Sequence, residues 1–424
     1  MEPYCVIIDG FSSGKYYAQE FKKLGYRCLH VQSRDTVPVI LSGCFCTGNY
    51  HAAMTHTDME ETLQWIGNHG VPRFIIAGSE PAVNLADSLG AGFHLESANA
   101  LELTEARRDK YLMMEAVRSA GARAIRQFRT TSPDAALDWI KSEGLSYPIV
   151  VKPLNSVAGD GFSLCKSPRD IHEAFGRILG KMNLLNIEND AALVQEFIAG
   201  EEYVVDTVSR DGQHMVSDFL KYGKSFTVEG GNIYKSCSFL PRDFPLASVL
   251  ERYVISVLEA LGIRNGPAHV EIMVDKNGPV LIEVGARLAG CTLDPELIGA
   301  VYGHTQVSLS VMAYHDPQAF KAQYARAEKP FHQHLEMVFL SCETDGVVAK
   351  ISDEPIRALR SFKKIDFSVR EGAPVKRTRN LTEAAAVVYL MHKDRHVIEE
   401  DRQAIFAREG EIIQMLSPDC AVTA

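Results

Sequence analysis

Two glutamates in neighbouring apolar segments have the spacing of a cation site. Glu271 lies in AHVEIMVD and Glu283 in PVLIEV, and the turn-forming pair Asn277-Gly278 between them indicates a β-hairpin. A lone carboxylate in an apolar strand carries a large desolvation penalty, which a bound cation relieves. Oxygen ligands beside phosphates favour Mg²⁺ or Mn²⁺. For either carboxylate alone, a salt bridge at a strand end is the open alternative.

Three further residues share this hairpin. The period of two along a strand places His269 on the face of Glu271 and Leu281 on the face of Glu283. Arg287 follows Glu283 by four residues, so its guanidinium could reach negative charge that develops beside the cation. We expect His269 to bind a substrate carboxylate or a reaction intermediate, with a structural hydrogen bond as the alternative.

A second candidate site precedes the hairpin in the sequence. Lys152 ends the apolar run PIVVKP and is followed by small residues at 155–161, NSVAGDG. This pattern suits a polyphosphate, because small residues let backbone amides approach the phosphate oxygens while the ammonium neutralises charge. An exposed lysine beside a hairpin turn is the competing interpretation.

The elements that position these residues change in character along the chain. Strands and helices alternate in the first 120 residues, which predicts a doubly wound parallel sheet. We expect a small two-layer α+β domain at 121–200, a larger domain at 201–329 with a mixed or antiparallel sheet, and a small α/β appendage at 330–424. The turn at Ser12, Ser13 and Gly14 could present amides to a substrate carboxylate, or be a plain strand-to-helix turn.

Composition narrows the class of protein. The 424 residues carry 44 Lys and Arg against 54 Asp and Glu, a net charge of −10 that gives no general attraction to nucleic acid or anionic lipid. No run of apolar residues approaches the roughly 20 of a spanning helix, and the first residues lack a signal-peptide pattern. The nine scattered cysteines are typical of a reduced protein. We therefore expect a cytoplasmic protein without nucleic-acid or membrane partners; a homodimer is the open oligomeric expectation.

The ordered motifs resemble those of the ATP-grasp enzymes. The series is RRDK (107–110), VVKP (150–153), NSVAGDG (155–161), QEFIAGEEY (195–203), HVEI (269–272) and LIEVGAR (281–287). Within that superfamily, Gly266–Glu271 as GxxHxE and Arg287–Gly290 as RLAG are most similar to the L-amino-acid ligases, which form dipeptides. The resemblance spans nearly the whole chain and implies the ATP-grasp fold, ATP and Mg²⁺ as cofactors, and small amino-acid substrates.

The resemblance also implies roles for individual residues. Glu271 and Glu283 would ligate Mg²⁺, while Arg287 would stabilise an acyl phosphate and the tetrahedral intermediate, near Gly290 and His269 on the substrate side. The backbones of Glu196 and Ile198 would form hydrogen bonds to the edge of the adenine. Glu202 would bind the ribose, and Leu281 would form part of the apolar surface beneath the adenine. The remaining nucleotide contacts would come from Lys110, Lys152 and the loop residues Ser156, Gly159 and Gly161.

One position departs from the family pattern. The family motif E-x-N-x-R is here Glu283-Val-Gly285-Ala-Arg287, so a third metal ligand is missing. Taken over all its motifs, the resemblance implies an enzyme that ligates amino acids through an acyl phosphate at the expense of ATP. Two alternatives remain at this point: another carboxylate ligase or a carboxylase like biotin carboxylase, and a nucleotide-binding regulatory protein without turnover.

Overall fold

The N-terminal part of the chain forms a parallel sheet. The computed structural model describes residues 2–42, 45–227, 230–290, 293–325 and 330–416. Four strands pair in parallel in the order β3-β2-β1-β4, with bounds β1 Tyr4–Ile8, β2 Arg27–Gln32, β3 Ala52–Thr55 and β4 Ile75–Ala77. The helices are α1 Lys15–Lys23, α2 Val39–Ser42, α3 Met59–Gly67 and α4 Val83–Gly92.

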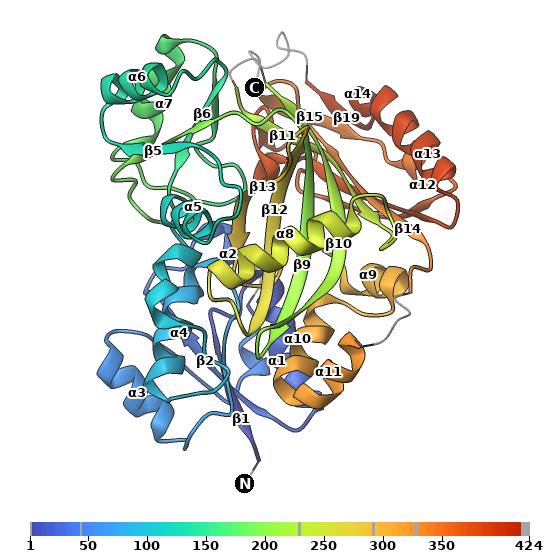
Figure 1. The fold of residues 1–424 in the computed structure, drawn as a ribbon. Coiled ribbons are helices and arrows are strands. Elements are labelled where there is room, and N and C mark those ends of the chain that lie inside the picture. Colours follow the sequence, from blue (N-terminus) through green and yellow to red (C-terminus); the bar gives the residue numbers. More distant parts are fainter. Residues whose placement is uncertain (1, 43–44, 228–229, 291–292, 326–329, 417–424) are drawn as a thin grey trace.

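Helices cover both faces of this sheet, as a doubly wound arrangement requires. Cys5 and Ile7 of β1 pack against α1 and against α10 (Gln306–His315), which comes from far along the chain. Val6 and Ile8 of the same strand pack against α3 and α4 on the other face. The alternation of β1 between two buried faces explains its continuous apolar sequence. The predicted doubly wound fold is confirmed for this part (Figure 1).

A small antiparallel sheet follows, after α5 (Lys110–Ser119). Its strand order is β5-β8-β6-β7, and helices α6 and α7 cover one face with a compact apolar core. The bounds are β5 Gln127–Thr130, β6 Ile149–Pro153, β7 Ser163–Cys165, β8 Ala192–Glu196, α6 Pro133–Ser142 and α7 Pro168–Ile178. This is the two-layer α+β unit that the sequence predicts.

The large sheet occupies the centre of the molecule (Figure 1). Its eight strands run in the order β13-β12-β9-β10-β11-β14-β18-β16, and every strand pair is antiparallel, so of the two predicted alternatives, a mixed or an antiparallel sheet, the structure has the antiparallel one. Short connections such as the one between β9 and β10 permit only antiparallel neighbours. The bounds are β9 Glu201–Arg210, β10 Gln213–Phe226, β11 Asn232–Leu240, β12 Gly266–Asp275, β13 Gly278–Gly285, β14 His334–Leu340, β16 Phe362–Phe367 and β18 Ala386–His392.

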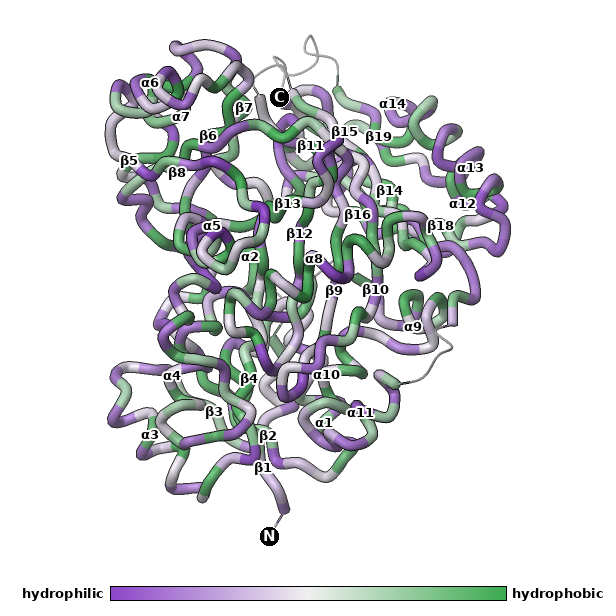
Figure 2. Tube along the Cα trace, viewed as in Figure 1, coloured by the Kyte–Doolittle hydropathy of each residue, from purple (hydrophilic) through white to green (hydrophobic). Residues whose placement is uncertain are grey.

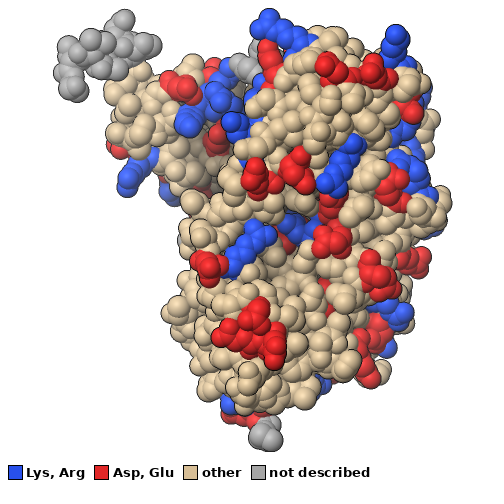
Figure 3. All heavy atoms as spheres, turned by 90° about the vertical axis from the view of Figure 1, so that its left-hand side faces the viewer, with Lys and Arg blue, Asp and Glu red and all other residues tan. Residues whose placement is uncertain are grey.

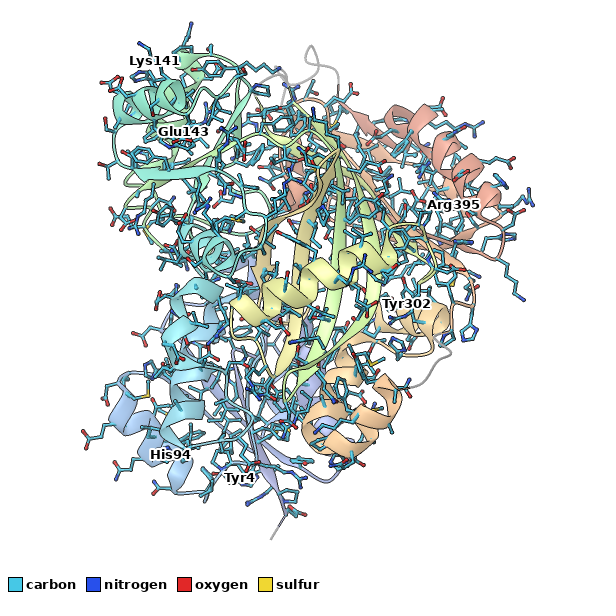
Figure 4. The ribbon with its side chains drawn as sticks, in the orientation of Figure 1. Tyr4, His94, Lys141, Glu143, Tyr302 and Arg395 are labelled. Carbon is cyan, nitrogen blue, oxygen red and sulfur yellow. The ribbon has the colours of Figure 1, made fainter. Side chains whose placement is uncertain are left out.

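The two faces of the large sheet pack against different partners. Helices α5 and α8 (Ala247–Ala260) cover one face with the largest apolar core. On the other face, α9 (Pro295–Tyr302) packs against β10 and β11. The hydroxyl of its last residue, Tyr302, donates to the carbonyls of Phe219 (3.2 Å) and Leu240 (2.8 Å) (Figure 4). Helix α11 (Pro317–Tyr324) follows α10.

The end of the chain adds a three-stranded sheet and outer helices. The sheet has the order β17-β15-β19, and α13 covers the strands β14 and β18 of the large sheet. The bounds are β15 Gly346–Ile351, β17 Pro374–Val375, β19 Ile413–Met415, α12 Glu354–Arg357, α13 Arg395–Ala407 and α14 Glu409–Ile412. The outer helices α3 and α13 carry hydrophilic segments (Figure 2). Across the described ranges, no helix combines the length and apolar character needed to cross a membrane.

Candidate active site

A single large cavity collects most of the predicted site residues. It has a volume of about 770 Å³ and is lined by residues from the N-terminal sheet, the small sheet and one face of the large sheet. Lys110, Lys152 and residues 156–160 contribute from one side, and His269, Glu271 and Glu283 from the large sheet, whereas the predicted Gly161 is not among the lining residues. Motifs that lie far apart in the sequence therefore meet at one place. Outside it, acidic and basic side chains are mixed over the face in Figure 3.

The predicted carboxylate pair is formed by the hairpin β12-β13. Glu271 lies directly opposite Glu283 in the register of the two strands. Within the described ranges, no three His, Cys, Asp or Glu side chains are grouped so that they could hold a metal ion. Two facing carboxylates nevertheless suit Mg²⁺, which usually takes one or two protein carboxylates and fills its other positions with water and phosphate. The donor set therefore fits Mg²⁺ as an ion shared with a nucleotide.

A β-bulge removes Leu281 from the cavity. The register shifts between Glu271 and Ile272, so that Ile272 pairs with Leu281 and the period of two is broken before Glu283. Leu281 is fully buried in the core on the opposite face of the sheet, against α5 and α8. Ile282 lines the cavity instead. The structure does not bring Leu281 to the predicted adenine floor.

His269 lies between two carboxylates. Its Nδ1 is 2.7 Å from Oδ1 of Asp206 on β9, and its Nε2 is 3.5 Å from Oε1 of Glu271. Burial disfavours the charged ring, but the charge and hydrogen bond of Asp206 outweigh it and raise the pKa of His269 to about 10. Burial also opposes ionisation of Glu271, yet His269 and nearby lysines lower the pKa of that carboxyl to about 2. His269 thus lies on the face of Glu271, as the strand period predicts.

Arg287 is held by a carboxylate from the N-terminal part of the chain. Its Nε is 2.7 Å from Oε2 of Glu80, and its Nη1 donates to the carbonyl of Leu288 at 2.9 Å. Glu80 also forms an ion pair with Arg108. Burial opposes the charged guanidinium, but Glu80 and Glu283 raise the pKa of Arg287. Arg287 therefore enters the cavity as a permanent cation, beside Gly290 on the same loop.

Two lysines lie on the phosphate side. Lys110, at the start of α5, is 2.9 Å from Oε2 of Glu283 and donates to the carbonyl of Ser156 at 2.7 Å. Lys152 on β6 is buried rather than an exposed turn residue. Burial and then the charge of Lys110 lower the pKa of Lys152 to about 8. No described residue forms an ion pair with Lys152, so a ligand phosphate can serve as its partner.

The loop 155–161 has the backbone of a tight turn over this side of the cavity. Ala158, Gly159 and Gly161 have φ values of 58°, 77° and 68°, in the left-handed region. The Ser156 hydroxyl donates to Asp160 Oδ2 at 2.7 Å, which also accepts from the backbone amide of Leu184 at 2.9 Å. Hydrogen bonds within the loop and to the following segment therefore fix its shape.

Apart from Leu281, the predicted adenine and ribose residues line the same cavity. Glu196 and Ile198 lie at the end of β8 and just beyond it. Glu202 on β9 is 2.6 Å from Nζ of Lys224, and this ammonium lies 4.1 Å from the ring centroid of Tyr234. Glu202 is therefore already paired with a cation, which the sequence did not indicate.

The far side of the cavity is uncharged and apolar. Leu220 and Phe239 continue the row of paired residues that begins at Glu271 and passes through Val204. The wall is completed from the end of the chain, and its members are Leu220, Tyr222, Cys237, Leu293, Met337, Phe339, Ala384 and Val387. One continuous sheet face thus passes from two carboxylates to a hydrocarbon surface.

Sequence reasoning missed several buried charged residues of the cavity. Asp206 and Lys224 lie in strands of the large sheet, and Glu80 follows β4. For Asp206 the signal was present, since an acidic residue inside the apolar run EEYVVDTV resembles the context of Glu271. Glu80 follows the carboxyl end of a parallel strand, where ligands of such sheets bind. The pairing of Lys224 with Glu202 depends on strand register and had no local signal.

Comparison with known proteins agrees with this geometry. A model of the ATP-grasp domain matches residues 145–294. Dapdiamide A synthase of Enterobacter agglomerans is 32% identical over 388 residues, which cover 90% of this chain and 90% of that protein. The chain belongs to the ATP-grasp family. Among further ATP-grasp relatives, alanine–anticapsin ligase of Bacillus subtilis strain 168 is 26% identical over 249 residues, 50% of this chain and 48% of the relative.

A solved structure shows the same ATP-grasp fold. The crystal structure of an L-amino acid ligase from Bacillus licheniformis superposes with a TM-score of 0.73 at 18% identity, over 98% of each chain. The fold that this chain shares with the solved structure therefore covers nearly its whole length. It includes β14, β16 and β18 after residue 330, which belong to the same large sheet as β12 and β13.

Proposed function

We propose that this ATP-grasp protein is an ATP-dependent ligase that joins two amino acids. The observation that carries the proposal is the meeting in one cavity of Lys110, Lys152, the Glu271–Glu283 pair and Arg287. These groups supply cations for a polyphosphate, ligands for Mg²⁺ and a cation for a developing oxyanion. The full-length similarity to dapdiamide A synthase supports the same conclusion.

The reaction proceeds in two transfers. A carboxylate oxygen of the first amino acid bonds to the γ-phosphorus of ATP as the bond to ADP breaks, which gives an acyl phosphate. The amine nitrogen of the second amino acid then attacks the acyl carbon and loses a proton. The carbon–oxygen bond to phosphate breaks, so the products are an amide, ADP and a phosphate that retains one oxygen of the carboxylate.

Residues of this chain have distinct parts in these transfers. Lys152 and Lys110 bind phosphate oxygens, Glu271 and Glu283 hold Mg²⁺, and Arg287 faces the charge of the acyl phosphate and the tetrahedral intermediate. Bound Mg²⁺ would neutralise charge on the phosphates and orient them.

Ser156, Gly159 and Gly161 close over the phosphates and keep water from the acyl phosphate. Glu196, Ile198, Glu202 and, in place of Leu281, Ile282 surround the nucleoside. His269 and Gly290 contact the substrate. We propose that the reaction takes place in the cytoplasm, where ATP is available.

The uncharged wall selects an apolar side chain. Between Leu220, Met337 and Val387, a charged substrate side chain would lose its hydration without gaining a partner. We expect at least one of the two amino acids to be aliphatic or aromatic.

A matrix of amino-acid pairs tests this function. The twenty amino acids are combined with ATP and Mg²⁺, and phosphate release and product mass are measured. We expect ADP and phosphate only with productive pairs, and a product mass equal to the sum of the pair less one water. Release that depends on bicarbonate would instead indicate a carboxylase. Tight ATP binding without release for any pair would indicate a regulatory protein.

A further inference from the structure

The side chains of Arg287 and Glu80 occupy the space in which a side chain at Gly285 would lie. Gly285 ends β13 opposite His269, two residues after Glu283. A Cβ at this position would lie 2.8 Å from Cζ and 3.0 Å from Nη2 of Arg287. The same Cβ would lie 3.0 Å from Oε2 of Glu80. Real Cβ atoms essentially never show a separation of 2.8 Å, and separations of 3.0 Å are tighter than most, so a larger residue at 285 must shift the Arg287 guanidinium and crowds the Glu80 carboxylate.

Glu80 occupies this space from another part of the chain. It begins a short 3-10 helix, Glu80–Ala82, directly after β4, and its side chain is almost completely buried. One carboxylate oxygen pairs with Nε of Arg287 and the other with Arg108. Burial opposes the charged carboxylate, but Arg287, Arg108 and Lys110 together lower the pKa of Glu80. The carboxylate is thus a fixed anion between two guanidinium groups.

The pairing leaves one nitrogen of Arg287 available for a ligand. Nε faces Glu80, and Nη1 donates to the carbonyl of Leu288. Nη2 makes no hydrogen bond to any described residue and lies on the side of Gly285. A guanidinium fixed at two nitrogens keeps its third in one direction, which is what an oxyanion-binding group requires.

We infer that Gly285 leaves room for Glu80 and that Glu80 is the residue that positions Arg287 for acyl transfer. The inference rests on the proposed ligase function. In the family motif E-x-N-x-R, an asparagine side chain stands at the position of Gly285. In this chain the Glu80 carboxylate, which follows β4 of the N-terminal sheet, lies at that place and pairs with Arg287. Glu80 acts through Arg287, without contact to the reacting atoms.

Steady-state kinetics of three variants tests this role. We expect Gly285→Ala and Glu80→Asp each to lower kcat by about 10- to 100-fold, because misplacing a catalytic group by about 1 Å has effects of that order. The KM for ATP should stay within about threefold, since neither change removes a phosphate contact. Gly285→Asn, which restores the family residue, should lower kcat as well. Gly299→Ala in α9 is the matched control, because no atom lies closer than 3.9 Å to its added Cβ.

A double variant tests whether alanine at residue 285 acts through the Glu80–Arg287 ion pair or by disturbing the local fold. With Glu80→Ala already present, the carboxylate that holds Arg287 beside Gly285 is gone and the guanidinium can move away from an added Cβ, so adding Gly285→Ala should change kcat by less than about threefold. Calorimetric binding of a nonhydrolysable ATP analogue shows that each variant retains a folded site. If Gly285→Asn fails to fold, Gly285→Ala and Glu80→Asp still decide the question.

Three results would overturn the inference. The first is a kcat of Gly285→Ala within about threefold of the parent. The second is a Gly285→Asn variant that turns over faster and needs less Mg²⁺, which would make residue 285 a vacated metal position. The third is loss of analogue binding in proportion to kcat, which would make the pair purely structural. A parent without ligation for any amino-acid pair would refute the proposed function itself, a separate result.

Discussion

The charge of Lys152 gives a direct test by pH. Because burial and Lys110 lower the pKa of Lys152 to about 8, the ammonium is charged at pH 7 and loses its proton as the pH rises above 8. We expect the Kd of a nonhydrolysable ATP analogue to rise several-fold between pH 7 and pH 9, measured by calorimetry. Lys152→Ala should bind weakly at both pH values, and Lys152→Arg should flatten the profile. A parent Kd that is constant with pH would contradict the assignment.

Arg287 should affect chemistry more than binding. Arg287→Met removes the cation and keeps much of the apolar stem, so we expect amide formation to fall by 10²-fold or more while affinity for the ATP analogue stays near that of the parent. Arg287→Lys should rescue activity only in part, because an ammonium cannot reproduce the planar fork that pairs with Glu80. Equal losses of binding and turnover would instead make Arg287 a nucleotide clamp.

For individual residues, the sequence predicted which residues belong to the site better than it predicted the direction in which each side chain points. The apolar runs and the Asn277-Gly278 turn were sufficient to place Glu271 and Glu283 on facing strands of one hairpin, and the strand period placed His269 on the face of Glu271, whereas the direct pairing of the two glutamates depends on the bulge. The same period misplaced Leu281, because a bulge depends on how two strands meet and has no marker in PVLIEV. Glu80 is brought to Arg287 by tertiary packing across some 200 residues, which local patterns do not encode.

Among the elements, the loop 155–161 depends on its glycines. At Gly161, φ is 68° and an added Cβ would lie 2.6 Å from Cγ of Pro153. Gly161→Ala should therefore strain or move the loop and raise the KM for ATP by about 10-fold or more, since alanine at a positive φ costs about 1 kcal/mol or more before any clash. Gly176→Ala in α7 meets no atom within 4 Å and is the control. Equal KM values for the two variants would show that the loop does not close over ATP.

The elements themselves were predictable where their sequence pattern is local. The first βαβ segments, the small two-layer unit and the β12-β13 hairpin all follow from periodicity and turn residues. The order of the large sheet was not predictable, because β14 and β18 join β11 through pairing between distant segments. That pairing brings Met337 and Val387 to the apolar wall of the cavity.

For the whole molecule, Arg107 is a buried link between the N-terminal sheet and the central body. Its fully buried guanidinium donates to Asp87 of α4 at 2.8 Å and to the carbonyl of Leu261, just after α8, at 2.8 Å. Arg107→Met leaves Asp87 as an uncompensated buried carboxylate, so we expect a loss of about 3–5 kcal/mol in the free energy of unfolding, measured by chemical denaturation. The exposed pair of Arg169 with Glu173 is the control, and Arg169→Met should leave the free energy of unfolding close to that of the parent. Similar losses for both would contradict the link.

The transfer of a labelled oxygen tests the proposed ligation most directly. An acyl phosphate requires one carboxylate oxygen of the first amino acid to leave with phosphate. When that amino acid carries ¹⁸O in its carboxylate and is incubated with ATP, Mg²⁺ and its productive partner, mass spectrometry of the released phosphate should find one ¹⁸O per molecule of amide formed. Phosphate without label, or AMP in place of ADP, would contradict the account.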